Sequence, residues 1–446
     1  MSLKERWSSS LAFVAVATGA AVGLGSIWKI PYEIGRQGGG AFVLLYLFFV
    51  FVLGIPLMLS EMSIGMIARN DPIGALKSLA NKYHALPGWV WLGRLSLFTL
   101  MCVLSFYSVV AGWDFDYLIW VLTGKFVQPN VAIIQSHWTD LMGSPARLVV
   151  YHTLFLLLTM AVVIWPIQKG IEKASKIMMP TLFLVLIILD VYGLFLPGKQ
   201  AALAYLFQFR WEEISFGVMV SALGNALFTL AVGAGCMLVY AAYLPKNTKV
   251  ISLVFTIAFF DALVALMSGF AIFSIVFSSG LNPDSGPGLM FLTMPVAFAK
   301  MSYGIWIGLG FFVLLLFAAW TSSISLLEPL VAFGISHLKW SRRYAVVIMG
   351  LIVWFLGLLS ALSFNVLSDW RVFGMPNFFE WISYLATNIC LLVGGLGYAI
   401  FVGWKIPIKD LKKVISTGPH IFYIWYKMVQ YVLPAWILFL LFKEAG

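Results

Sequence analysis

Apolar residues occur along this chain in eleven long runs that short polar connections separate. About 20 consecutive apolar residues suffice to cross a bilayer, so each run predicts one membrane span. The predicted spans lie near residues 11–35, 40–68, 88–122, 147–165, 174–196, 214–243, 250–279, 302–335, 344–363, 377–403 and 418–442. The pattern therefore predicts an all-α integral membrane protein with about 11 transmembrane helices.

Composition agrees with this fold class. Of 446 residues, 62% are hydrophobic and only 10% are charged, and the mean hydropathy is +0.97, far from the balance of a soluble domain. The net charge of +10 would suit nucleic acid. However, most basic residues lie in short loops between apolar runs, where membrane topology explains them. We expect a lipid bilayer, and no nucleic acid, as the partner of this charge.

Lysine and arginine are unequally shared between the two sides of the predicted array. Eighteen of the 28 lie on the side of the N-terminus, eight on the other side and two within spans. The positive-inside rule then predicts a cytoplasmic N-terminus in a multi-pass protein of the plasma membrane, in a bacterium the inner membrane. The longest outer connections, 123–146 and 280–301, are rich in Gly, Pro and Ser, and we expect them to form a cap.

The first span contains an unusual stretch, residues 19–31, with three glycines in seven positions from Gly19 to Gly25. Each glycine costs about 1 kcal/mol relative to alanine in a helix interior, which predicts a helix that stops midway and restarts. Hydrocarbon cannot satisfy the freed peptide groups, so the break must line an enclosed cavity. Free N–H groups near Leu24 suit a carboxylate. Free carbonyls between Gly19 and Val22 suit an ammonium group or sodium, so the pair suits a zwitterionic amino acid.

The sixth span carries a second interruption, from Phe228 to Gly235. Its last two glycines have the same spacing as Gly23 and Gly25 in the first span. Paired broken helices at the midplane of inverted repeats are typical of secondary transporters. The glycines alone leave a second interpretation open, in which both helices are merely kinked for close packing.

These two breaks suggest how the chain is divided. Five spans in each half would place the second half in the membrane the opposite way round. We expect a single transporter domain, 1–446, with a first inverted repeat at 11–196, a second at 214–403 and an additional helix at 418–442.

Polar side chains within the spans are candidates for cation binding. Thr321 and Ser322, one turn after Ala318, present hydroxyls of the kind that hard cations prefer, although such groups often bond back to the preceding turn. Asp261 and Glu61 are ionisable residues inside spans, which are functional candidates by default. We expect Asp261 to complete a cation site and Glu61 to accept hydrogen bonds from N–H groups freed at a helix break.

Several ungapped motifs occur in order between Arg6 and Trp404. They read RWSSSLAFVAVATGAAVGLGSIWKIPYEIGRQGGGAF, GIPLMLSEMSIG, FTLAVGAGCMLVYAAYL, DALVALMSGFAIF, GPGLMFLTMP and TSSISLLEP. Together they resemble the neurotransmitter:sodium symporter family, in its bacterial amino-acid transporter branch. The resemblance implies sodium-driven uptake of an amino acid by alternating access, and two inverted five-helix repeats with helices 1 and 6 broken.

The resemblance also implies two sodium sites and a substrate site. The first sodium site would use the Ala21 carbonyl, Ser26, Thr229, Asp261 and the substrate carboxylate. The second would use the carbonyls of Gly19, Val22 and Ala318 and the hydroxyls of Thr321 and Ser322. The substrate carboxylate would meet the N–H groups of Leu24 and Gly25 and the Tyr107 hydroxyl. Its amine would meet the carbonyls of Ala21, Phe228 and Thr229. The wall around its side chain would consist of Val103, Tyr107, Phe228, Ala231, Ala234, Ser322 and Leu326, with Tyr107 and Phe228 closing over it.

The chain departs from the family pattern at several of these positions. Ser26 and Asp261 both stand where relatives have Asn. In the first sodium site, Ser26 is therefore a shorter ligand than Asn, and Asp261 adds a negative charge. The outer gate, normally an Arg facing an Asp, here has Lys29 facing Ser383, with Glu380 one turn earlier as a substitute. Because Lys cannot form the bidentate pair that Arg forms, we expect a looser gate. Ser336 replaces an Asp expected at the inner end of the eighth span.

The small Ala234 replaces a bulky residue of relatives that take small aliphatic substrates. With Ala231 and an apolar wall, it favours a large hydrophobic or aromatic amino acid. Two alternatives use the same fold: a proton-coupled or sodium-independent exchanger, with Asp261 the first candidate to carry a proton, and an amino-acid sensor that does not transport. An enzyme is disfavoured because the five histidines are scattered and no nucleophile–base motif occurs. Monomer and homodimer both remain open.

Overall fold

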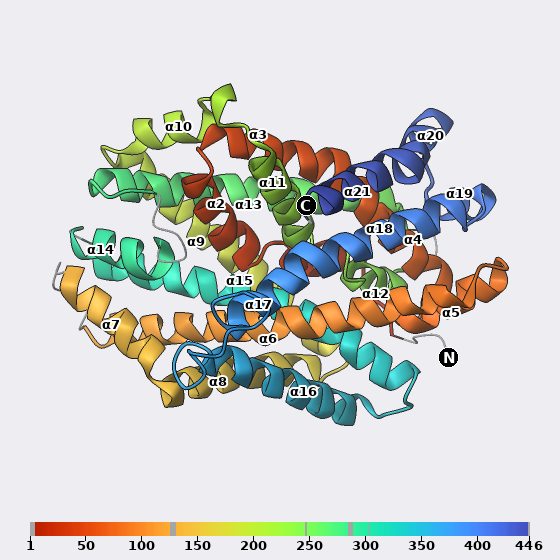
Figure 1. Cartoon of the computed structure of the whole chain (residues 1–446), viewed down its shortest axis with the longest axis horizontal. Coiled ribbons are helices and arrows are strands. Elements are labelled where there is room, and N and C mark those ends of the chain that lie inside the picture. Colours follow the sequence, from red (N-terminus) through yellow and green to blue (C-terminus); the bar gives the residue numbers. More distant parts are fainter. Residues whose placement is uncertain (1–4, 125–130, 246–247, 284–288, 302, 445–446) are drawn as a thin grey trace.

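The computed structural model describes residues 5–124, 131–245, 248–283, 289–301 and 303–444, and these residues are almost entirely helical (Figure 1). Nine helical segments of this part of the chain are long and apolar enough to cross a membrane. They are α3–α4 (Gly40–Ala68), η3–α6 (Pro87–Leu122), α8 (Pro145–Val163), η5–α9 (Gln168–Phe195), α13 (Val250–Ser278), α15 (Gly304–Ser336), α16 (Arg342–Leu362), α17–α18 (Phe378–Trp404) and α20–α21 (Pro419–Phe442).

The first and sixth predicted spans are each split into two helices. The first consists of α1 (Ser10–Ala21) and η1–α2 (Gly25–Arg36), which are bent by 47° at the break. The sixth consists of α11 (Phe216–Thr229) and α12 (Cys236–Ala242). Together with the nine continuous segments, these pairs account for the eleven predicted spans.

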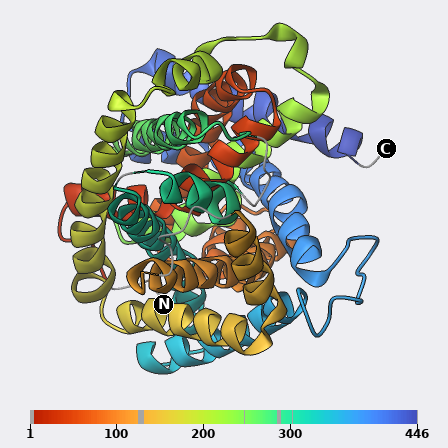
Figure 2. The same cartoon turned by 90° about the vertical axis from the view of Figure 1, so that its left-hand side faces the viewer.

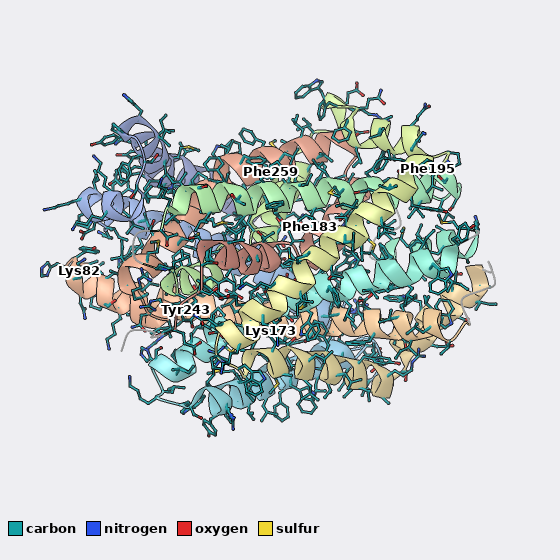
Figure 3. All side chains as sticks on the ribbon, turned by 180° about the vertical axis from the view of Figure 1, so that it is seen from behind. Lys82, Lys173, Phe183, Phe195, Tyr243 and Phe259 are labelled. Carbon is teal, nitrogen blue, oxygen red and sulfur yellow. The ribbon has the colours of Figure 1, made fainter. Side chains whose placement is uncertain are left out.

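Shorter helices lie at the two ends of the bundle. Helices α5 (Pro72–Lys82) and α19 (Ile408–Val414) lie at the end near the N-terminus, and α7 (Val131–Gly143), α10 (Lys199–Phe207) and α14 (Met294–Ala299) at the other (Figure 1). We call these the N-terminal end and the distal end; Figure 2 looks onto the distal end. Helix α9 (Lys173–Phe195) runs obliquely across the back of the bundle (Figure 3).

Two details differ from the sequence-based boundaries. The connections predicted at 123–146 and 280–301 contain α7 and η7–α14 (Leu289–Ala299), because apolar side chains of both pack together: Trp138 stacks on Phe291 at 5.7 Å between ring centroids. The fifth span begins at Gln168, earlier than the predicted 174, because a π-helical turn precedes α9.

The first break is confirmed between Ala21 and Gly25. Helix α1 ends at Ala21, and the next residue, Val22, has φ −75° and ψ 85°, outside the helical region. A Cβ at Gly23 would lie 2.2 Å from the Ser322 hydroxyl oxygen and 2.9 Å from that of Tyr107. Glycine is therefore required here by close approach of the backbone to two polar side chains.

The second break is also confirmed, between Thr229 and Cys236. Ala231, Gly233 and Gly235 all have positive φ, at 52°, 95° and 74°, so the chain leaves the helical path there. The Glu61 carboxylate, fully buried on α4 (Ile55–Ala68), accepts a hydrogen bond from the Gly233 N–H at 2.5 Å. The predicted role of Glu61 at a helix break is confirmed.

Helix α12 packs on α4 with backbone almost against backbone. A Cβ at Gly65 would lie 1.9 Å from the Leu238 carbonyl oxygen. We therefore expect Gly65→Ala to force the two helices apart and to destabilise the fold by about 3 kcal/mol, the upper range for overpacking. Thermal unfolding of the detergent-purified protein measures this. Gly224→Ala on α11 is the control, since a Cβ there meets nothing within 4 Å; equal stability of both variants would contradict the close packing.

Candidate functional site

A cavity lies between the two helix breaks, and we call it the central cavity. Its wall contains every residue predicted to surround a substrate side chain. The lining residues are Ala20, Ala21, Gly23, Gly25, Leu100, Val103, Tyr107, Phe228, Thr229, Ala231, Ala234, Cys236, Ser322, Leu326 and Leu391. Almost all of these are apolar or present backbone, so the polar groups of the cavity come mainly from the breaks.

Tyr107 on α6 (Val90–Leu122) meets the N-terminal end of the second half of the first span. Its hydroxyl oxygen accepts a hydrogen bond from the Leu24 N–H at 3.1 Å. A Cβ at Gly25 would touch the Phe228 ring and Thr229, each at 3.2 Å. The structure therefore brings the predicted carboxylate partners together beside Phe228, at the positive end of a helical segment.

Asp261 lies at the centre of a buried polar cluster, which we call the Asp261 cluster. Its carboxylate is fully buried and accepts hydrogen bonds from the Ser26 hydroxyl and, at 3.0 Å, from the Tyr46 hydroxyl. The Tyr46 hydroxyl also lies 3.2 Å from the Thr229 hydroxyl oxygen. Ser26 reaches the Ala21 carbonyl at 3.4 Å. The shorter Ser26 side chain thus still joins the group that the resemblance implied.

Tyr46 was not predicted from the sequence. It sits in α3 (Gly40–Phe49), within a run of ten residues of which nine are apolar, so nothing in the local pattern separates it from a core aromatic residue. Its contact with Asp261 joins residues that are 215 positions apart. Only the packing of α3 against α13 and α11 reveals it.

A second oxygen cluster joins α15 to the first break. The Ser322 hydroxyl donates to the carbonyls of Gly19 and Ala20, each at 3.2 Å. Thr321 instead donates to Ala318 and Phe317 carbonyls at 3.1 Å, which is the back-bonding arrangement. A Cβ at Gly19 would lie 3.2 Å from Thr321 Cβ, so the two helices touch here. Val22, the last predicted member, directly follows the end of α1.

A larger cavity of about 1160 Å³ opens on the distal side of Tyr107 and Phe228, and we call it the vestibule. Aromatic side chains dominate its wall, among them Trp28, Phe106, Trp113, Trp138, Phe364 and Phe379. Because Tyr107 and Phe228 line both cavities, they form the partition between them.

Lys29, Glu380 and Ser383, the residues of the predicted outer gate, all line the vestibule. The Lys29 ammonium lies 4.7 Å from the centroid of the Phe228 ring, a cation–π contact. Within the described residues it makes no ion pair with Glu380. An ion-paired gate therefore stays a prediction, whereas a contact of Lys29 with the partition residue Phe228 is present.

The N-terminal end of the bundle is closed by the N-terminal segment itself. Trp7, only 2% exposed, donates from its indole N–H to the Tyr240 carbonyl at 2.9 Å and packs edge-on against Tyr240 and Tyr243. Next to it, the Ser8 amide donates to the Glu172 carboxylate at 3.0 Å. These contacts were not predicted, because a single tryptophan in a polar tail carries no periodic signal.

A buried ion pair lies beside this closure. The Arg342 guanidinium of α16 binds Glu328 of α15 with both terminal nitrogens, at 3.2 and 2.5 Å. Glu328 is fully buried and also accepts from the Tyr243 hydroxyl at 2.8 Å. Ser336, where an Asp was expected, donates to Asp71 at 2.5 Å. The polar contacts of this end thus connect α12, α15, α16 and the start of α5.

Sequence comparison finds known proteins that are similar to this chain. The model of the sodium:neurotransmitter symporter family matches residues 4–138 and 138–445. An uncharacterised sodium-dependent transporter of Bacillus subtilis, YhdH, is 32% identical and covers 99% of this chain and 98% of its own. A similar one from Haemophilus influenzae is 31% identical, covering 98% and 97%.

A solved structure agrees over the whole chain. The crystal structure of MhsT in complex with L-phenylalanine has a TM-score of 0.92 and 34% sequence identity, and covers 99% of both chains. The resemblance in the sequence motifs is thereby confirmed, and with it a transporter rather than an enzyme. The chain belongs to the sodium:neurotransmitter symporter family.

Proposed function

We propose that this sodium-coupled transporter imports a large hydrophobic or aromatic amino acid. The observation that carries this proposal is the central cavity, in which two helix breaks supply the polar groups and an apolar wall supplies the rest. The polar groups at the helix breaks suit the ammonium and carboxylate groups that all amino acids share. The apolar wall suits a side chain whose free energy falls when it leaves water.

The backbone would hold the amino and carboxyl groups. We assign the carboxylate to the N–H groups of Leu24 and Gly25 and to the Tyr107 hydroxyl, which already lies 3.1 Å from the Leu24 nitrogen. The ammonium group would meet carbonyls of Ala21, Phe228 and Thr229 at the ends of the broken helices. Ala231 and Ala234 leave room for a bulky side chain, and the similar MhsT was solved with L-phenylalanine.

Two sodium ions would lie beside the substrate. The Asp261 cluster offers a carboxylate, three hydroxyls and the Ala21 carbonyl. The second cluster offers hydroxyls and carbonyls of α15 and the first break. Oxygen ligands of these kinds suit hard cations such as sodium. In this arrangement Ser26, Thr229 and Asp261 serve the first ion, and Gly19, Val22, Ala318, Thr321 and Ser322 the second.

Alternating access would use the partition and the closure already described. The two inverted repeats, 11–196 and 214–403, would rock about the central cavity, exposing it first through the vestibule and then at the N-terminal end. The excess of Lys and Arg on the side of the N-terminus predicts that the N-terminal end faces the cytoplasm of a bacterium. Whether the chain acts as a monomer or a homodimer does not affect this scheme.

Equilibrium binding of labelled L-phenylalanine tests the proposal. We expect binding in sodium that weakens more than 10-fold in potassium, and competition by L-tryptophan and L-leucine. Tyr107→Phe removes one hydrogen bond to a charged group, a loss of roughly 1.5–3 kcal/mol, so affinity falls at least about 10-fold. Tyr117→Phe on the same helix is the control, since the buried Tyr117 hydroxyl has no partner among the described residues. Binding indifferent to both sodium and Tyr107 would contradict the proposal.

A further inference from the structure

A shallow basic pocket of about 690 Å³ lies at the N-terminal end, between the start of α5 and the end of α15. It shares no residue with the central cavity or the vestibule. Its lining residues are Asn70, Gly74, Lys77, Ser78, Asn81, Ser336, His337 and Lys339. Every side chain in this set except that of glycine carries a hydrogen-bond donor, and none carries a carboxylate.

The acidic residue Asp71 lies beneath the pocket, and both of its carboxylate oxygens already accept hydrogen bonds. It is completely buried, and one carboxylate oxygen accepts from the N–H groups of Ile73 and Gly74 at 3.0 and 3.1 Å. The other accepts from the Ser336 hydroxyl at 2.5 Å and lies 3.7 Å from the His337 ring nitrogen. The carboxylate therefore holds the floor of the pocket and does not reach the two lysines at its rim.

Those two lysines, one on α5 and one just after the end of α15, have no acidic partner in the part of the chain that the structure describes. Lys77 on α5 is exposed and makes no ion pair with any described residue, and Lys339 donates only to the Ser336 carbonyl, at 2.7 Å. By contrast Lys82 and Lys413, at the same end, both bind Asp410, at 3.2 and 3.0 Å. The positive potential of the pocket thus remains available to a ligand.

Exposed apolar side chains occur in both parts of the chain that carry these charges. Leu338 stands between His337 and Lys339 and is 42% exposed. Trp91, soon after α5, is 67% exposed and carries the Arg94 guanidinium 4.3 Å from its ring. Tryptophan beside a basic residue is typical of the level of lipid headgroups.

We propose that this pocket binds a phosphate group, as the headgroup of an anionic phospholipid presents it. A phosphate offers several charged acceptor oxygens, which match two ammonium groups and the donors of Asn70, Ser78 and Asn81. Basic pockets between membrane helices bind headgroups in this manner. A bound phosphate would join Lys77 on α5 to Lys339, three residues after the end of α15, beside the existing contact of Ser336 with Asp71.

The test measures ligand binding to the full chain in uncharged detergent, by calorimetry, without any need for transport. The three probes are short-chain phosphatidylglycerol, short-chain phosphatidylcholine and inorganic phosphate. We expect phosphatidylglycerol to bind at least 10-fold more tightly than phosphatidylcholine. At about 1 kcal/mol for each lysine, Lys77→Gln combined with Lys339→Gln should weaken it about 30-fold.

The matched control changes two other exposed lysines of the same end, Lys405→Gln with Lys409→Gln, which should alter affinity less than 2-fold. Phosphate binding that is lost with Lys77 and Lys339 also supports the site, and comparison of its affinity with that of the lipid identifies the source. Equal binding of both lipids, or equal loss in both double variants, overturns the proposal. Thermal unfolding confirms that all variants are folded.

Discussion

Asp261→Ala is expected to abolish sodium-driven uptake of L-phenylalanine into proteoliposomes. Asp261 is fully buried, and its carboxylate is the one negative charge among the residues proposed to hold the first sodium ion. Without it, the protein would offer a cation in this buried position only neutral oxygens, and the substrate carboxylate would be the one remaining negative charge to compensate for lost hydration. We expect uptake to fall at least about 100-fold, which corresponds to roughly 3 kcal/mol of lost ion binding.

Two further variants separate charge from shape. Asp261→Asn keeps an oxygen ligand and should retain part of the uptake, with a higher sodium requirement. Asp190→Ala, on α9 and outside the lining of the central cavity, should leave the sodium requirement unchanged. Full sodium-driven uptake by Asp261→Ala would refute this assignment. Uptake that follows a proton gradient instead would favour the exchanger in which Asp261 carries a proton.

Ala234→Phe should reverse the preference for substrate size. Ala234 is 4% exposed and lies in the wall of the central cavity, on the break between α11 and α12. A benzyl group there would occupy space proposed for the substrate side chain. Because protein interiors are close-packed, moving neighbouring residues to restore that space would cost free energy. Affinity for L-phenylalanine should fall at least about 100-fold, while L-alanine should bind as well as before or better.

Competition binding with amino acids of increasing size measures this reversal. Ala234→Gly is the control, because it enlarges the wall without filling it and should keep the preference for aromatic substrates. If Ala234→Phe still bound L-phenylalanine normally, the side chain of the substrate would have to lie elsewhere in the cavity.

The backbone features of this protein were largely predictable. Apolar runs of sufficient length identified the spans, and glycines at Gly23, Gly25, Gly233 and Gly235 marked both breaks. A Cβ would clash at all of these positions except Gly25, where it would be tight, and Gly233 and Gly235 also have positive φ. The role of Glu61 followed from the same reasoning, since a freed N–H inside a membrane needs an acceptor. Local chemistry decided all of these features.

The contacts that were missed join residues far apart in the chain. Tyr46 meets Asp261, and Trp7 meets Tyr240 across 233 positions. The pairing of Glu328 with Arg342 depends on how α15 and α16 pack at their ends. An aromatic or charged residue in an apolar run has many conceivable partners, and only the packed arrangement selects one.

The two unwound segments have an evolutionary consequence. If peptide groups hold the ammonium and most of the carboxylate, then a side-chain replacement at these positions leaves those peptide groups in place, since every amino acid except proline retains both its N–H and its C=O. Mutation can instead reshape the wall formed by residues such as Val103 and Ala234. Related transporters can thereby evolve specificity for new substrate side chains while the backbone continues to bind the amino and carboxyl groups in the same way.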